Sequence, residues 1–289
     1  MLDSIVERFY PITGLMQTEG VIRDIAVEYV KEQKEDGVAY AEGRFAPQYH
    51  TREGLSYREI IRSMAEGLEE GAEDVGVKTT LIVAIGRETT APRGVEVARA
   101  AAGSGAVSAL DLGGPEAGNP PHRFREAFRI ATDAGLRSTV HAGEGAGSLR
   151  KNLAYMEEAV FELGANRLGH AIPLSKSKRL LKAVLSKGIA IEMNPVSNLV
   201  LGNIHDLRDL SVDTLLNQGV MVSVNSDDPW LWSGGHLPEV YNRVCQAYGF
   251  GFEELDRLAL NAFEGSFASQ KDRAWLADQY HTARRRVGN

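Results

Sequence analysis

Seven short β-rich runs, each followed by a longer helical pattern, constrain the fold of this chain more than any other feature of its sequence. The runs lie at residues 38–45, 79–87, 106–114, 136–144, 166–171, 189–195 and 220–228. Between them lie amphipathic stretches, for example residues 57–76 and 178–188, with apolar residues three and four positions apart. Strict alternation of strand and helix is typical of parallel βα units, so we expect an α/β fold.

The spacing of these units favours one domain over two. No linker rich in proline, glycine or serine separates any unit from the next. The chain has 289 residues, of which 43 % are hydrophobic, and this is enough apolar material for a sizeable core. We therefore expect a single domain spanning residues 1–289.

Polar or ionisable side chains stand at the C-terminal end of nearly every predicted strand. They are Glu42, Arg44, Arg87, Asp111, His141, Glu144, His170, Asn194, Asn198, Asp227 and Asp228. In an open sheet only the ends near a switch point would gather at one site, whereas in a closed βα barrel all strand ends converge on one face. The pattern therefore predicts a (β/α)8 TIM barrel, although seven strands are one fewer than eight.

Charge and cysteine content exclude several classes of protein. The chain has 39 acidic and 32 basic residues, and its only basic cluster is Arg284 to Arg286, so no nucleic-acid-binding face is expected. The single cysteine, Cys245, excludes an internal disulfide and any multi-cysteine zinc site. No apolar run approaches the roughly 18 residues of a membrane span, and residues 1–14 do not resemble a signal peptide. We expect a cytoplasmic protein that does not bind membranes.

The segment VSVNSDDP places two adjacent carboxylates, Asp227 and Asp228, directly after a β-branched run. Two like charges at the end of a buried strand repel each other and lose hydration. A divalent cation bound by Asp227 would relieve the repulsion and leave Asp228 free to accept a hydrogen bond from a substrate. The structural alternative is a pair that caps a turn or helix before Pro229.

Two histidines and a glutamate stand at the ends of two earlier predicted strands, residues 136–144 and 166–171. The segment HAGE offers the His141 imidazole as a metal ligand and, three residues later, the Glu144 carboxyl as a general acid. The segment LGHA places His170 at the next strand end. Each histidine alone could equally be a hydrogen-bonded residue of the core, but together with the two aspartates they supply the parts of a metal site.

At these residues the sequence resembles the adenosine deaminase family of metal-dependent barrel hydrolases. The similarity extends along essentially the whole chain, through YAEGRFAP, DLGGPE, HAGEGAG, RLGHA, NPVSNLVLG and SVNSDDP in that order. The resemblance implies an eight-stranded βα barrel that binds one zinc ion and a small-molecule purine substrate. It also implies a reaction that replaces the 6-amino group of adenosine, or of a related 6-aminopurine, with oxygen and releases ammonia.

The resemblance also implies a role for each matching residue. His141 and Asp227 would be zinc ligands, and Glu144 would protonate N1 of the purine. His170 would hold and help to deprotonate the attacking water, Asp228 would hydrogen-bond N7, and the backbone N–H of Gly114 would meet N3.

One departure from the family pattern is large. The family carries two further zinc ligands in a His-x-His motif on its first strand, and this sequence contains no His-x-His. The barrel is therefore expected to lack its first strand, and an open barrel edge would favour self-association with another chain. Three interpretations follow: a truncated or mis-started deaminase, a natural variant that completes its site differently, or a non-catalytic descendant that binds purines or partners.

Four further residues allow two interpretations each. Arg44 and Arg87 at strand ends could meet a substrate phosphate or carboxylate, or could form structural ion pairs with Glu42 or Asp111. Trp230 and Trp232, which follow the two aspartates, could line the mouth of the pocket or pack under the last helix.

Overall fold

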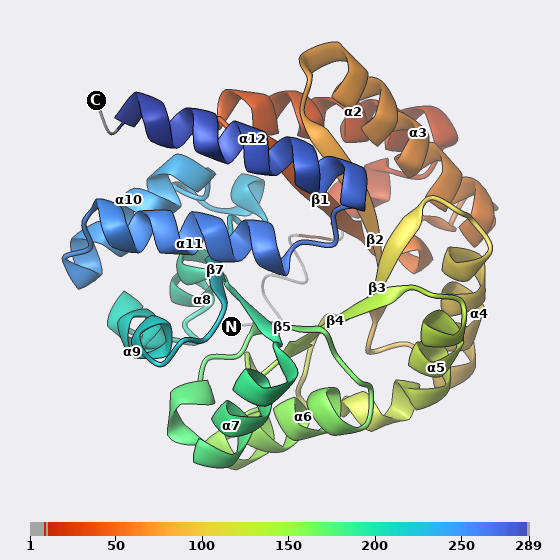
Figure 1. The fold of residues 1–289 in the computed structure, drawn as a ribbon. Helices are drawn as coiled ribbons and strands as arrows, with labels where there is room; N and C mark the ends of the chain where they lie inside the picture. Colours follow the sequence, from red (N-terminus) through yellow and green to blue (C-terminus); the bar gives the residue numbers. More distant parts are fainter. Residues whose placement is uncertain (1–8, 10, 288–289) are drawn as a thin grey trace.

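The computed structural model describes residue 9 and residues 11–287 of the chain, so the predicted absence of a signal peptide at residues 1–14 falls largely outside the described residues. Seven parallel strands form one sheet in which each strand pairs with the next along the chain (Figure 1). The strands are β1 (Tyr40–Phe45), β2 (Lys78–Gly86), β3 (Val107–Gly113), β4 (Arg137–Ala142), β5 (Arg167–His170), β6 (Ala190–Met193) and β7 (Val222–Val224). Each lies within one of the seven predicted runs or begins one residue before it, so the strand prediction is confirmed.

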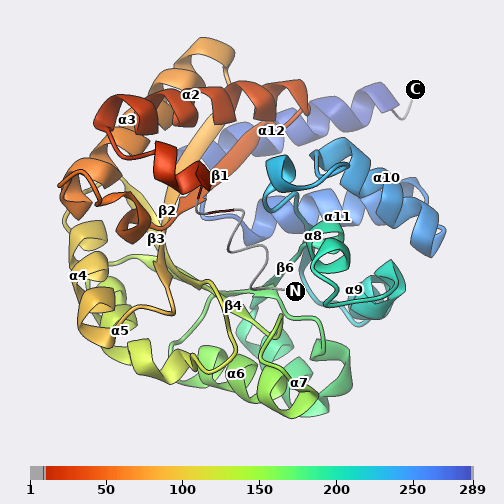
Figure 2. The same ribbon diagram turned by 180° about the vertical axis from the view of Figure 1, so that it is seen from behind.

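Helices follow the strands and surround the sheet in both views (Figures 1 and 2). The α-helices are α2 (Glu19–Glu35), α3 (Tyr57–Val75), α4 (Ala91–Ala102), α5 (Arg125–Asp133), α6 (Leu149–Phe161), α7 (Lys178–Lys187), α8 (Pro195–Val200), α9 (Val212–Asn217), α10 (Leu237–Tyr248), α11 (Phe252–Gly265) and α12 (Gln270–Val287). Short 3-10 helices are η1 (Pro47–His50), η2 (Pro121–Phe124), η3 (Leu174–Lys176), η4 (Leu207–Leu210) and η5 (Pro229–Leu231). Within the described ranges, no helix is long and apolar enough to cross a membrane.

Helix α3 illustrates how local sequence sets the ends of an element. Ser56 and Glu59 form a capping box at its N-terminus, in which each side chain bonds the backbone N–H of the other. Gly76 ends the helix in the left-handed conformation, with φ of 74°. The predicted helical stretch, residues 57–76, agrees with these bounds.

The sheet curls so that its first strand faces its fifth and sixth strands. No pairing joins β1 to β7 among the described residues, but side chains of β1 cross the interior. Arg167 of β5 pairs with Glu42 of β1 at 2.6 Å, and Arg44 of β1 pairs with Glu192 of β6 at 3.0 Å. These contacts place the strands around a common interior, which is the arrangement of a barrel with one strand missing.

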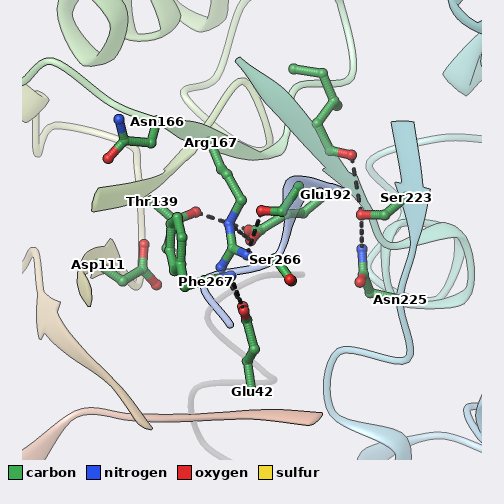
Figure 3. A network of polar contacts seen from close by, with 12 residues as sticks. Glu42, Asp111, Thr139, Asn166, Arg167, Glu192, Ser223, Asn225, Ser266 and Phe267 are labelled. Carbon is green, nitrogen blue, oxygen red and sulfur yellow. Dashed lines mark hydrogen bonds and ion pairs between the residues drawn. The ribbon is translucent and has the colours of Figure 1, made fainter. Parts of the chain in front are cut away.

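Where these side chains cross it, the interior of the curled sheet contains ion pairs instead of apolar contacts. Figure 3 shows Arg167 between Glu42 and Glu192, beside the ring of Phe267. The guanidinium carbon of Arg167 lies 3.5 Å from the Phe267 ring centroid, and Thr139 donates a hydrogen bond of 2.9 Å to Glu192. An unpaired charge in a barrel interior is destabilising, so each arginine in the network is balanced by neighbouring carboxylates.

The network leads to the C-terminal face of the sheet. Arg44 contacts both Glu192 and Asp111, the latter at 3.5 Å, and Asp111 contacts His141 at 3.0 Å. An unbroken series of ion pairs therefore runs from Glu42 to the predicted metal ligand His141.

Candidate active site

The predicted site residues stand where the curl of the sheet brings strand ends together. His141 lies in β4, His170 is the last residue of β5, and Asp227 and Asp228 follow β7. The His141 and His170 rings lie side by side, with 5.1 Å between their centroids. The prediction that these strand ends meet at one face is therefore confirmed for the two histidines.

The imidazole of His141 is held by a buried carboxylate. Its Nδ1 lies 3.0 Å from one oxygen of Asp111 and 3.2 Å from the other, and Asp111 is fully buried. Burial alone would lower the pKa of His141, but the Asp111 carboxylate outweighs it and raises that pKa to about 9. This contact occupies Nδ1, so Nε2 is the nitrogen that can bind a metal ion, which it does only after losing its proton.

His170 is fixed by two asparagines. Its Nδ1 lies 3.1 Å from Oδ1 of Asn198, and its Nε2 lies 3.1 Å from Nδ2 of Asn194. Because Asn198 offers an acceptor and Asn194 a donor, this arrangement suits a neutral ring with its proton on Nδ1. The backbone of His170 has φ of 64°, a conformation that an L-residue keeps only when its surroundings impose it.

The Glu144 carboxyl faces His170 across a short gap. Its Oε1 lies 3.7 Å from Nδ1 of His170, and Nδ2 of Asn203 donates to the same oxygen at 3.4 Å. Burial raises the pKa of Glu144, and the nearby Asp227 carboxylate adds to this, while His170 and His141 act in the opposite direction. A carboxyl with a raised pKa in a partly enclosed site has the property that a general acid needs.

The two aspartates have different surroundings. Asp227 has φ of 60°, which turns the chain sharply between the two side chains. Burial, and then the charge of Asp227, raises the pKa of Asp228 to about 8. A carboxyl with this pKa holds a proton near neutral pH and can donate a hydrogen bond as well as accept one.

Gly114 lies at a point where a side chain has no room. Its φ is 85°, and a Cβ atom there would lie 2.9 Å from a carboxylate oxygen of Glu88 and 3.5 Å from the backbone nitrogen of Arg87. Only glycine fits this backbone without strain. The position therefore presents bare backbone at the end of β3.

A complete zinc site is not present among the residues that the structure describes. No group of three or more histidine, cysteine, aspartate or glutamate side chains there is arranged to hold a metal ion. His141 and Asp227 supply two donors, whereas catalytic zinc sites usually have three protein ligands. These two residues alone therefore do not complete a zinc site.

The sequence matches the adenosine deaminase family over residues 2–283. The chain belongs to the adenosine deaminase family. An adenosine deaminase of Mycobacterium avium is 32 % identical to this member over 299 residues, covering 96 % of this chain and 80 % of the relative.

Two solved structures show the same fold. The crystal structure of an adenine deaminase from Arthrobacter aurescens is 30 % identical, with a TM-score of 0.89, and the match covers 97 % of this chain and 84 % of that one. An amidohydrolase of Burkholderia ambifaria, solved with bound zinc, is 23 % identical with a TM-score of 0.82, and the match covers 92 % of this chain and 74 % of that one. The predicted α/β barrel lacking one strand is thereby confirmed.

Family membership makes this protein a deaminase-like hydrolase acting on C–N bonds. The relative and the adenine deaminase structure are named as enzymes, so they give no support to the non-catalytic interpretation.

The structure decides between the alternatives for the two arginines, whereas the two tryptophans both line one surface cavity. Arg44 pairs with Asp111 and Glu192, and Arg87 pairs with Glu116 at 3.6 Å, so both form structural ion pairs. Trp230 is 71 % exposed and donates to Glu32 at 2.9 Å. Trp232 is buried.

Several polar residues of the site region were missed by sequence reasoning. They are Glu116, Arg167, Glu192 and Asn203. Glu116 lies in the segment DLGGPE and Arg167 in RLGHA, while Glu192 lies in the predicted strand at residues 189–195, where a charged residue inside an otherwise apolar run was the available signal.

Proposed function

We propose that this protein catalyses the hydrolytic deamination of a 6-aminopurine base or nucleoside, giving the 6-oxo purine and ammonia. The observation that carries the proposal is that Glu144, a half-buried carboxyl of raised pKa, and the fixed imidazole of His170 lie 3.7 Å apart at one strand-end face. A positioned acid beside a positioned base is what addition of water to C6 requires.

In this proposal Glu144 donates a proton to N1 of the purine. Protonation of N1 draws electron density from C6 and lowers the barrier to attack at that carbon. General-acid catalysis of this kind contributes typically about 10²- to 10⁴-fold in rate. The proton that Glu144 gives up would be recovered from the attacking water as the amino group departs.

His170 would orient the attacking water, accept its first proton and pass that proton to the departing amino group, which leaves as ammonia, while the second proton of that water returns to Glu144. In the structure Nε2 of His170 accepts a hydrogen bond from Nδ2 of Asn194. To reach Nε2, the attacking water would have to displace Asn194 from this nitrogen. Asn198 would keep its contact to Nδ1 and hold the ring plane while this exchange occurs.

Asp228 and Gly114 would hold the purine ring. N7 of a 6-aminopurine carries no hydrogen, so Asp228 would donate to it as a protonated carboxyl and would not act as the hydrogen-bond acceptor that the sequence suggested. The bare backbone at Gly114 would allow its N–H to approach N3.

Zinc is proposed as the cofactor because the resemblance to the family implies it and the B. ambifaria amidohydrolase holds it. His141, through Nε2, and Asp227 would be two of its ligands.

The test is a pair of matched glutamate variants assayed with adenosine and adenine at excess zinc. Glu144→Gln keeps the size of the side chain but cannot donate an acidic proton, so turnover is expected to fall by at least about 100-fold. Glu126→Gln, at an exposed position of α5, is the control and should keep normal turnover. Near-normal turnover by Glu144→Gln would refute the proposed acid.

A further inference from the structure

Glu116 binds the loop that carries Glu144 through three consecutive backbone amides. Its two carboxylate oxygens accept from the N–H groups of Gly143 at 2.9 Å, Glu144 at 2.7 Å and Gly145 at 2.5 Å. Glu116 is 1 % exposed, so these bonds are shielded from water. The contacts join the segment after β3 to the segment after β4.

Within the described part of the chain, no other group accepts a hydrogen bond from these three amides. Gly143 has φ of 83°, and a Cβ there would lie 2.7 Å from the sulfur of Met156, so the chain turns tightly against helix α6. A turn of this shape points successive N–H groups to one side, where they form a concave site for an anion. Without Glu116 three buried or half-buried donors would lose their acceptor.

Arg87 forms an ion pair with Glu116. Its guanidinium is fully buried, lies 3.6 Å from a Glu116 oxygen, and donates to the carbonyl of Leu112 at 3.0 Å and to the carbonyl of His141. The pair therefore connects the ends of β2, β3 and β4. A buried ion pair adds little net stability, because desolvation of both charges offsets their attraction. Because the Arg87–Glu116 pair lies next to the loop that carries Glu144, its main effect is to fix the position of that loop.

We propose that Glu116 is a positioning residue that fixes the backbone of residues 143–145 and so holds the Glu144 carboxyl opposite His170. The proposal rests on the proposed function, in which Glu144 is the acid. Among the described residues, the side chain of Glu144 has two polar contacts, to His170 at 3.7 Å and Asn203 at 3.4 Å, so its placement depends mainly on the backbone that carries it. Loss of the Glu116 contacts would move the acid and leave the purine-binding groups Asp228 and Gly114 in place.

The test replaces Glu116 by glutamine, which has nearly the same size but puts an NH2 group where one oxygen accepted. Amide hydrogen exchange at Gly143, Glu144 and Gly145 is expected to accelerate at least about tenfold, since at least one bond is lost. Misplacement of a catalytic group by about 1 Å can cost about 100-fold, so kcat for adenosine or adenine should fall by about 10- to 100-fold while KM stays within about twofold.

Two further variants make the result decisive. Glu116→Asp keeps the charge on a shorter side chain and should retain more of both amide protection and kcat than Glu116→Gln. Glu126→Gln is the matched control at an exposed site in α5 and should change neither.

Three outcomes would overturn the role of Glu116. The first is unchanged exchange at residues 143–145 in Glu116→Gln, and the second is faster exchange there with an unchanged kcat. The third is a uniform rise in exchange across β2 and β4, which would mark a purely structural residue. Absence of deamination by the unaltered protein would instead refute the proposed function and, with it, this role.

Discussion

Glu192 offers the strongest test of the interior ion-pair network. Its carboxylate contacts two arginines, Arg44 at 3.0 Å and Arg167 at 2.7 Å, and accepts from Thr139 at 2.9 Å. Burial alone would raise the pKa of Glu192, but Arg167 and Arg44 outweigh it and lower that pKa from 4.5 to about 2. At about 1.4 kcal/mol per pH unit, the difference corresponds to about 3 kcal/mol of native-state stability near neutral pH.

The substitution Glu192→Gln should therefore lower the free energy of unfolding by about 3 kcal/mol at pH 7. Removing one partner of a buried pair costs about 3 to 5 kcal/mol, and the lower end applies here because Arg44 keeps Asp111 and Arg167 keeps Glu42. This is a large part of the roughly 5 to 15 kcal/mol that stabilises an ordinary folded protein.

The pH dependence has a definite sign. A carboxyl whose pKa is lower in the folded state stabilises the fold above its unfolded pKa, and this contribution is lost as the pH falls. For Glu192 the loss should occur between pH 4.5 and about pH 2. In Glu192→Gln that part of the pH dependence should disappear.

Urea denaturation followed by circular dichroism, at pH 7 and at several values down to pH 3, measures both effects. Glu126→Gln is the control, because Glu126 and Arg129 form an ion pair in which both side chains are more than half exposed. That variant should unfold close to the unaltered protein at every pH. A loss of less than about 1 kcal/mol in Glu192→Gln, or an unchanged pH profile, would refute the stabilising role assigned to the network.

Three other perturbations test different parts of the structure. Gly67→Ala should lower the free energy of unfolding, measured by urea denaturation, by about 2 kcal/mol, because the new Cβ would lie 2.3 Å from the carbonyl oxygen of Arg23 where α3 packs on α2. Gly20→Ala is the control: a Cβ there would have nothing within 4 Å, so the substitution should be neutral or stabilise by up to about 1 kcal/mol. If Gly67→Ala and Gly20→Ala changed the free energy of unfolding equally, α2 and α3 would be free to move apart at no cost. Ser56→Ala removes the capping box of α3 and should lower the unfolding free energy by about 1 kcal/mol, and an unchanged midpoint would mean that the cap is dispensable. Calorimetric zinc titration should show weaker binding in Asp227→Asn than in Asp228→Asn, and the reverse order would mean that the two aspartates have exchanged roles.

The sequence was sufficient for the strands and for the face on which the site lies. The period of the apolar residues identified each βα unit, and the rule that parallel strand ends converge placed His141 and His170 together, as observed. Asn194 and Asn198 belong to the set of polar side chains predicted at strand ends, and both contact His170.

The contacts that cross the barrel could not be predicted in the same way. The pairing of Arg167 with Glu42 joins residues 125 positions apart, and it depends on how far the sheet curls and on its register. Local patterns contain neither quantity. The acceptor role of Glu116 likewise depends on a left-handed glycine at 143 that points three amides toward it.

The most direct test of the proposed function is ammonia release from adenosine and adenine, followed together with the ultraviolet change to the 6-oxo product, by this chain at excess zinc. We predict turnover that requires zinc and is lost in Glu144→Gln. Absence of ammonia from both compounds while the folded protein holds zinc, or equal turnover by Glu144→Gln, would contradict the proposed function.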